Sequence, residues 1–284
     1  MKFLRYLFFL NLIGFSSLKF SAIEDYYQYK SEPTSSNYGL TGILETPNAR
    51  MMKEGEIKFT FSSSFPNEYT TITTSPFPWL EASYRYNEIK NKRYSGDTSF
   101  SGNQTAKDKG FDFKVRLFEE SDYSPSVAIG LLDVGGTGIF ASEYFAFTKS
   151  IGNLDATTGI AWGNLGRGGD LHYNPFINIL GDNFKSRTSK NQGLGGEFNV
   201  DAFFSGPAAI FGGVEYYFKK HGLKFKLEYD TSNYDMNRNN PLDVKSHINY
   251  GFNYFYSENL NLGVSYERGK ELRFTFVFKE TFSE

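Results

Sequence analysis

The stretch LNLGVSYERGKELRFTFVF, residues 260–278, decides the fold class of this chain. On both sides of a central Arg-Gly-Lys turn, apolar residues recur at every second position, with polar or small residues between them. Because successive side chains on a β-strand point to opposite faces, each half has one apolar, aromatic-rich face and one mostly polar face, with Val277 as an exception. The apolar positions are Leu260, Leu262, Val264, Tyr266, Leu272, Phe274, Phe276 and Phe278.

The same alternation recurs along most of the chain ahead of this hairpin. It is clear in residues 57–65, 80–86 and 111–117, where aromatic and aliphatic residues alternate with polar or charged ones. Residues 56–279 divide into about 12 such strands, and a strand that crosses a lipid bilayer needs about 9–11 residues. The sequence therefore predicts an all-β fold, an antiparallel transmembrane β-barrel of about 12 strands, with its apolar face toward lipid and its polar face toward the interior.

The connections between these strands fall into two classes, which predicts long loops on one side of the barrel and short turns on the other. Polar, aperiodic residues 88–109 suit a long surface loop, and glycine-rich residues 163–196 suit a second. The expected short turns are residues 152–153, 219–222 and 258–259, and the expected long loops centre near residues 95, 180 and 237.

Composition fits a barrel and excludes several other classes of protein. Hydrophobic residues make up 39% of the 284 residues, and no segment after the N-terminal leader is apolar enough for a spanning helix. Aromatic residues make up 18%, which suits aromatic girdles at two bilayer interfaces. The formal net charge is −2 with both signs interspersed, so the basic stripe that nucleic-acid binding requires is absent from the sequence.

Cysteine does not occur in this chain. A disulfide scaffold, a thiolate metal site and a cysteine nucleophile are therefore excluded. A lipid-anchored N-terminus also requires a cysteine to carry the acyl chains, so we expect none here.

The N-terminal residues have the features of a secretory signal peptide. Lys2 and Arg5 precede the ten-residue apolar core YLFFLNLIGF, which is too short to span a bilayer. We predict a signal peptide over residues 1–22 with cleavage after Ala22; a retained N-terminal anchor is the alternative. Residues 23–55 are then a mobile N-terminal segment with a turn that leads into the first strand, and residues 56–284 form an outer-membrane β-barrel.

Several stretches resemble one known family. They are GLTGILETPNARMMKEGEIKFTFS (residues 39–62), FPWLEASYRY (77–86), KGFDFKVRLFEESDYSPSVAIGLLDVGGTGIFASEYFAFTK (109–149), FSGPAAIFGGVEYYF (204–218) and LNLGVSYERGKELRFTF (260–276). In this order they resemble the YjbH family of outer-membrane exopolysaccharide proteins. The resemblance implies a barrel in the bacterial outer membrane that is tied to secreted polysaccharide, capsule or biofilm matrix.

The resemblance also carries expectations about length and partners. Longer relatives have roughly twice this length with a second barrel-like half, so this chain corresponds to a single short half. Family members are often labelled lipoproteins. This chain departs from that label, because it has no cysteine. The partners implied are outer-membrane lipid, a polysaccharide and periplasmic export proteins. No catalytic residues transfer from the family.

If the apolar faces point to lipid, charged residues on the opposite faces line the lumen. A charge on the lipid face would cost up to about 2–4 kcal/mol near the bilayer midplane. The signs of these charges are mixed, whereas a pore for polyanions would favour a mostly basic lining. A salt-bridged, partly filled lumen is one interpretation, and a narrow hydrophilic conduit or saccharide-binding groove is the other. The candidate lumen-lining residues are Glu81, Arg85, Asp112, Lys114, Arg116, Glu215, Lys224, Lys226, Glu228 and Glu267.

Catalysis has little support in the sequence. His172, His221 and His247 are isolated and share no metal-ligand spacing. We therefore predict no catalytic residue, cofactor or metal, and a non-enzymatic role in exopolysaccharide or capsule export or assembly. A small-solute porin or a structural barrel is the alternative. Tyr123, Trp162 and Tyr173 lie near loop ends, where aromatic rings stack on sugars or anchor a barrel at the membrane interface.

Overall fold

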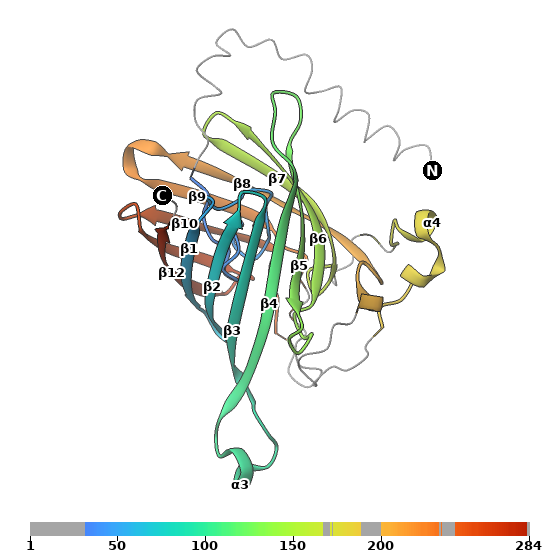
Figure 1. Ribbon diagram of the computed structural model, residues 1–284. Coiled ribbons are helices and arrows are strands. Elements are labelled where there is room, and N and C mark those ends of the chain that lie inside the picture. Colours follow the sequence, from blue (N-terminus) through green and yellow to red (C-terminus); the bar gives the residue numbers. More distant parts are fainter. Residues whose placement is uncertain are drawn as a thin grey trace.

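The computed structural model describes residues 32–166, 171, 173–188, 200–232, 234 and 242–282. Twelve strands form one closed barrel in which each strand is antiparallel to both neighbours (Figure 1). The strands are β1 (Glu56–Ser63), β2 (Asn67–Phe77), β3 (Leu80–Arg93), β4 (Thr105–Phe118), β5 (Ser126–Val134), β6 (Ser142–Ile151), β7 (Leu154–Gly163), β8 (Ala208–Phe218), β9 (Leu223–Tyr229), β10 (Ile248–Phe255), β11 (Leu260–Glu267) and β12 (Glu271–Thr281).

Pairing of the first strand with the last closes the sheet. Phe59 of β1 lies opposite Phe278 of β12, and Phe61 lies opposite Phe276. Closure leaves no strand edge whose backbone N–H and C=O groups lack partners. The predicted fold class and strand number are therefore confirmed.

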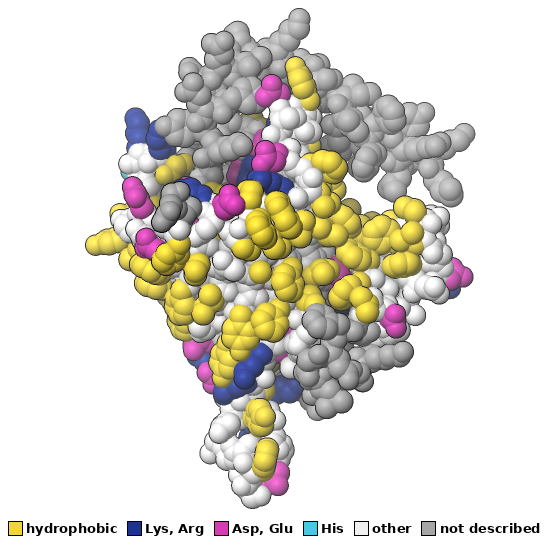
Figure 2. All heavy atoms as spheres, viewed as in Figure 1, with side chains coloured by type: hydrophobic (Ala, Val, Ile, Leu, Met, Phe, Trp, Pro, Cys, Tyr) yellow, Lys and Arg dark blue, Asp and Glu magenta, His cyan; other side chains and the backbone are white. Residues whose placement is uncertain are grey.

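The apolar face of the barrel points outward, as the alternation predicted. Phe274 and Ile72 are 63% and 52% exposed, whereas Thr60 and Thr71 on the opposite face are fully buried. Figure 2 shows hydrophobic side chains gathered over the middle of the visible face, with charged side chains above and below them. In the part of the chain that the structure describes, no helix is long and apolar enough to cross a membrane.

Alternate connections lie at opposite ends of the barrel, because consecutive strands are antiparallel. The short-turn rim carries residues 78–79, 119–125, 152–153, 219–222 and 256–259, together with the start of β1 and the end of β12. The long-loop rim carries the connections of residues 94–104, 164–207 and 230–247, and the shorter ones of residues 64–66, 135–141 and 268–270. The long loops therefore all lie at one rim, as predicted, and that rim also carries short connections.

The first long loop is shorter than the sequence indicated. Residues 88–109 were expected to be a surface loop, but β3 continues to Arg93 and β4 begins at Thr105. Cross-strand pairs such as Glu88 with Lys107 extend this polar hairpin beyond the barrel (Figure 1). A polar strand that projects into solvent has no apolar face, so it gives no alternating signal.

In the described ranges, the helices are short and lie in the connections between strands. Helix α3 (Thr98–Ser101) lies at the tip of the β3–β4 hairpin, where the Asp97 side chain caps it. The β7–β8 connection contains α4 (Ile177–Leu180), η1 (Asp182–Phe184) and η2 (Val200–Ala202), and η3 (Lys219–His221) forms the β8–β9 turn.

Part of the β7–β8 connection covers the outer face of the barrel near the long-loop rim. Glu143 of β6 points outward but is 1% exposed, because Arg187 pairs with it at 2.7 Å. Trp162 of β7 also points outward and stacks on Phe176 at 5.1 Å between ring centroids. This sector of the wall is therefore shielded by protein.

The lumen is filled by residues 33–52, which we call the inserted segment. Nearly all of its residues are buried, and its hydrogen-bond partners come from strands all around the wall. A mobile segment was expected over residues 23–55, but residues 33–52 have fixed partners inside the barrel. Residues 23–31 and the predicted signal peptide over residues 1–22 lie outside the described residues.

Candidate functional site: the lumen and its inserted segment

The inserted segment enters and leaves the lumen through the short-turn rim. At its start, Glu32 forms ion pairs with Lys279 near the end of β12 and with Lys53 just after the segment. In the middle, Asn37 donates a hydrogen bond to Glu267, which lies near the long-loop rim. The chain then returns to Met52, whose N–H binds Glu81 at the start of β3. The segment therefore enters and returns through the same rim, and its two ends lie side by side. Between them it folds back once, because the N–H of Thr41 also binds Glu81.

Two wall carboxylates hold backbone N–H groups of the inserted segment. Glu228 of β9 accepts hydrogen bonds from the N–H groups of Leu44, Glu45 and Thr46 at 2.8–3.1 Å. Glu81 of β3 accepts from Thr41 at 2.9 Å and from Met52 at 2.8 Å. An irregular segment inside a barrel has few backbone partners of its own, so these carboxylates take the place of a neighbouring strand.

Three wall lysines hold backbone carbonyl groups of the same segment. The Lys226 ammonium donates to the carbonyl oxygens of Ser35 at 3.2 Å and Ile43 at 2.5 Å. The Lys114 ammonium donates to those of Thr41 and Arg50, and Lys224 donates to that of Glu32, the residue just before the segment. The wall thus supplies both donors and acceptors, each matched to a polar group of the segment.

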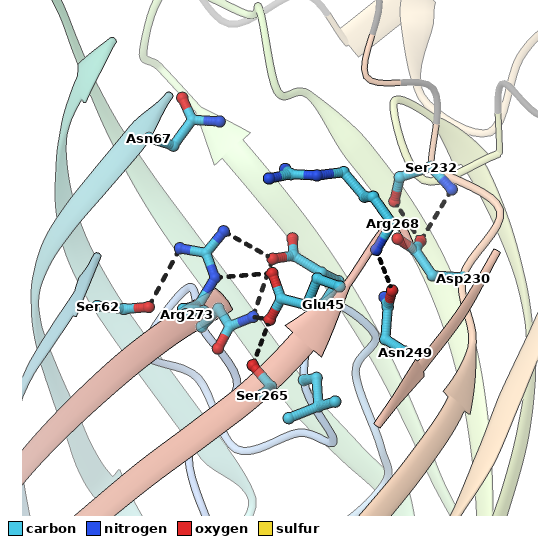
Figure 3. Close-up of polar contacts among 12 residues, drawn as sticks. Glu45, Ser62, Asn67, Asp230, Ser232, Asn249, Ser265, Arg268 and Arg273 are labelled. Atoms are coloured by element: carbon cyan, nitrogen blue, oxygen red, sulfur yellow. Dashed lines mark hydrogen bonds and ion pairs between the residues drawn. The ribbon is translucent and has the colours of Figure 1, made fainter. Parts of the chain in front are cut away.

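A buried polar network links the tip of the inserted segment to β11 and β12 (Figure 3). Arg273 lies between Glu267 of the wall at 2.9 Å and Glu45 of the segment at 3.1 Å. Asn37 donates to both of these carboxylates, at 2.7 and 2.8 Å, and Ser62 accepts from Arg273 at 3.2 Å. The single positive charge of the guanidinium lies between the two carboxylates and reduces the repulsion between them.

Arg50 fixes the returning leg of the inserted segment to the short-turn rim. Its guanidinium binds Asp155 at the start of β7 at 2.8 Å and Glu120 of the β4–β5 turn at 2.5 Å. Partial burial raises the pKa of Glu120, but the Arg50 and Lys149 cations outweigh burial and hold that pKa below its ordinary value. The Glu120 carboxylate therefore stays charged and bound at neutral pH.

Most of the apolar residues of the lumen lie on the wall formed by β5–β8, which also carries Asp155 and Glu215. Tyr144 of β6 lies over Gly130 of the neighbouring strand β5, where an added Cβ atom would come within 2.2 Å of the tyrosine ring. Phe211 lies over Gly159 in the same way, with 2.1 Å to the ring. A methyl group at either glycine would displace an aromatic ring. The apolar lumen cluster comprises Leu40, Ala49, Ala128, Leu132, Tyr144, Ala146, Ala161, Leu165 and Phe211.

Nine of the ten charged residues that the sequence placed in the lumen are at most 2% exposed. Arg85 is paired with Asp112 at 3.3 Å, and its guanidinium also lies 5.1 Å from the ring of Tyr38 in the inserted segment. Arg116 is the exception, because it lies at the short-turn end of β4 and pairs with exposed Glu119. The nine buried residues are Glu81, Arg85, Asp112, Lys114, Glu215, Lys224, Lys226, Glu228 and Glu267.

Other buried charges of the lumen were not among the predicted set. Their signal was available, since Lys58 and Arg273 occupy polar positions of alternating strands. Across the described residues, the buried charges of the inner wall and its rims are eight cations and ten carboxylates. The cations are Lys58, Arg85, Lys114, Lys224, Lys226, Arg268, Arg273 and Lys279, and the carboxylates are Glu56, Glu81, Asp108, Asp112, Asp133, Asp155, Glu215, Glu228, Asp230 and Glu267.

The aromatic and histidine candidates are scattered. Trp162 is 1% exposed beneath the β7–β8 connection, whereas Tyr123 and Tyr173 are 100% and 44% exposed on separate connections. His172 lies outside the described residues. Within the described ranges, no group of three or more His, Cys, Asp or Glu side chains is arranged to hold a metal ion.

Fold and lumen together define a class of protein, a closed antiparallel barrel with an apolar outer surface and a polar, occupied interior. Residues 34–284 match the family YjbH, described as “Exopolysaccharide biosynthesis protein YbjH”. A relative from Escherichia coli (strain K12), named “Uncharacterized lipoprotein YjbH”, is 38% identical over 252 residues, which cover 89% of this chain. The chain belongs to the YjbH family. It spans only 36% of the length of that relative.

Solved porin structures are similar to this chain in fold alone. A KdgM porin has a TM-score of 0.41 at 9% identity, covering 80% of this chain and 99% of the porin. A NanC porin has a TM-score of 0.39 at 10% identity, with the same two coverages.

Proposed function

We propose that this chain is a non-catalytic outer-membrane β-barrel that serves the export or assembly of an exopolysaccharide, such as a capsule or biofilm matrix. Membership of the YjbH family, with its description as exopolysaccharide biosynthesis proteins, supports the link to polysaccharide. The partners would be outer-membrane lipid, the polysaccharide and periplasmic export proteins.

The observation that carries the membrane placement is the closed barrel with its apolar side outward. Phe252 and Phe278 are 41% and 47% exposed on this outer surface, whereas Lys226 and Glu228 face the lumen. Such a surface suits acyl chains, and barrels of this kind place short turns in the periplasm and long loops outside the cell. The inserted segment would then begin and end at the periplasmic rim.

The occupied lumen supports a non-catalytic role. Glu81, Glu228, Lys114 and Lys226 bind the backbone of the inserted segment, which is a structural task for groups that could otherwise act as acids or bases. A general small-solute porin is the second candidate, because the wall of the lumen is polar. The inserted segment argues against it, since residues 33–52 fill the path that a solute would take.

The test of this function is a strain that lacks the protein. We expect secreted polysaccharide to fall at least about ten-fold, and to recover when the wild-type chain is supplied. A matched pair of variants examines the membrane placement in the same strain. Phe252→Lys places a charge on the outer surface, at an expected cost of about 2–4 kcal/mol, whereas Lys245→Glu changes a charge in a long loop.

We expect Phe252→Lys to lower the amount of folded barrel in outer-membrane fractions and Lys245→Glu to leave it unchanged. Normal secretion by the deletion strain would contradict the link to polysaccharide. Recovery of the wild-type chain in detergent-free buffer as a dispersed protein would contradict the membrane placement.

A further inference from the structure

The wall of the lumen recognises the inserted segment mainly through its backbone. Glu228 and Glu81 accept from five backbone N–H groups, and Lys226, Lys114 and Lys224 donate to backbone carbonyl groups. A polypeptide backbone is an uncharged chain with closely spaced donors and acceptors. A neutral polysaccharide is another such chain, because each hydroxyl group both donates and accepts a hydrogen bond.

The charge of the wall does not suit an anionic chain. The described inner wall buries eight cations against ten carboxylates, and six of the cations pair with carboxylates of the wall itself. Lys114 lies 3.3 Å from Glu81, and Arg273 lies 2.9 Å from Glu267. Pores that select anions present a lining of unpaired Lys and Arg, which this wall does not.

The route by which the inserted segment could leave is also defined. Both of its ends lie at the short-turn rim, where the Lys53 ammonium is 3.6 Å from the Glu32 carboxylate. The inserted segment can therefore withdraw through that rim without threading an end of the chain through the barrel. Asn37 and Glu45, which bind Glu267 and Arg273 near the long-loop rim, would be the last residues to leave.

From these observations we propose that the lumen is a binding site and conduit for an uncharged polysaccharide chain, whose path residues 33–52 occupy until they withdraw through the short-turn rim. This inference rests on the proposed function and adds to it the class of substrate and the way in which the lumen opens. The wall groups released by the segment are those that would bind the hydroxyl groups of the sugar.

The first experiment fixes the inserted segment in place. The hydroxyl oxygens of Ser35 in the segment and Thr60 in β1 are 3.4 Å apart, and the chain has no cysteine of its own. The double variant Ser35→Cys with Thr60→Cys should therefore form a disulfide that ties the segment to the wall. Ser121→Cys with Ser124→Cys is the matched control, because these hydroxyl oxygens are 2.7 Å apart in the exposed β4–β5 turn.

We expect the locked variant to lower secreted polysaccharide at least ten-fold when non-reducing gels show the crosslink. The control pair should secrete as the wild type does. Wild-type secretion by a fully crosslinked Ser35→Cys/Thr60→Cys protein would overturn the withdrawal of the segment.

The second experiment examines the substrate class in planar bilayers. A variant that joins Glu32 to Lys53 through two glycines lacks the inserted segment, and we expect it to conduct ions steadily. Neutral dextran oligomers should block this conductance at concentrations at least five-fold lower than oligogalacturonate of equal length. Stronger block by oligogalacturonate would overturn the assignment to an uncharged chain.

The locked variant gives the same measurement on the full chain. Its openings should occur only after reduction and should show the same preference for dextran. Failure of both proteins to conduct would overturn the conduit. These bilayer results are independent of secretion, so a deletion strain that secretes normally would remove the proposed function while block by dextran still supported the binding site.

Discussion

The two sides of the lumen bind the same inserted segment by different physical means. On the β5–β8 side, the segment buries Leu40 and Ala49 against small residues and two aromatic rings. On the charged side, which begins at the adjacent strand β9, groups such as Glu228 and Lys226 make individual hydrogen bonds to its backbone. Apolar burial is not directional, whereas hydrogen bonds fix each backbone group in one place. The charged side therefore sets the conformation of the segment, and the apolar side adds affinity.

The largest effect is expected from Glu228→Leu on the charged side. This change leaves three buried N–H groups of residues 44–46 without an acceptor. Each buried donor left without a partner costs about 1–3 kcal/mol, so a total loss of about 3 kcal/mol or more is expected. Hydrogen exchange at these amides should become about 100- to 3,000-fold faster. Glu258→Leu in an exposed turn is the control. Unchanged exchange in Glu228→Leu would show that the apolar side holds the segment alone.

A smaller effect is expected from Leu40→Ala on the apolar side. Leu40 is 2% exposed, and truncation of a buried leucine costs roughly 2–3 kcal/mol where the surrounding chain can partly relax. Exchange across residues 40–46 should therefore be faster than in the wild type but slower than in Glu228→Leu. Leu180→Ala, at a 57% exposed position, is the control. A larger effect of Leu40→Ala than of Glu228→Leu would reverse the order of the two sides.

The smallest effect is expected from Glu120→Gln at the short-turn rim. The variant loses the ion pair with Arg50, which is worth about 1 kcal/mol because the site is partly exposed. The folded-state pKa of Glu120 lies below its ordinary value of 4.5. The stabilisation is therefore complete at neutral pH and is lost as the pH falls through the folded-state pKa.

We therefore expect Glu120→Gln to speed exchange near residue 50 at pH 7, and the difference from the wild type to shrink as the pH falls through the folded-state pKa of Glu120, which lies below 4.5. Lys149→Gln, which removes a second and more exposed partner of Glu120, should have a weaker effect. A difference that stays constant from pH 7 down through the titration of Glu120 would show that the carboxylate does not act through its charge.

The barrel could be predicted from the sequence because its signal is local. Residues such as Phe274 and Phe276 alternate with polar neighbours, and the alternation alone gives the outward face and, with it, nine buried lumen charges. Lys58 and Arg273 occupy polar positions of the same alternating pattern, so the sequence also places them in the lumen. Val277 is apolar but occupies an inward position of the alternating strand, and it faces the lumen with 2% exposure.

The inserted segment could not be predicted because its partners are distant in sequence. Its stretch GLTGILETPN has no strand or helix period, and the groups that order it belong to strands from β1 to β12. Thr34 and Glu215, which share a hydrogen bond, are 181 positions apart. Such a segment has the composition of a loop, and only the closed wall around it gives it one conformation.

The shielded sector of the outer wall has a consequence for the behaviour of the barrel in the plane of a bilayer. Glu143 and Arg187 form an ion pair on the outside of β6, beneath the β7–β8 connection, where an ordinary barrel would face lipid. Among the described residues, the perimeter is therefore uneven, because protein covers the strands β6 and β7 near the long-loop rim. In the proposed membrane placement, a neighbouring protein would meet a different surface at this sector than at strands that face lipid directly.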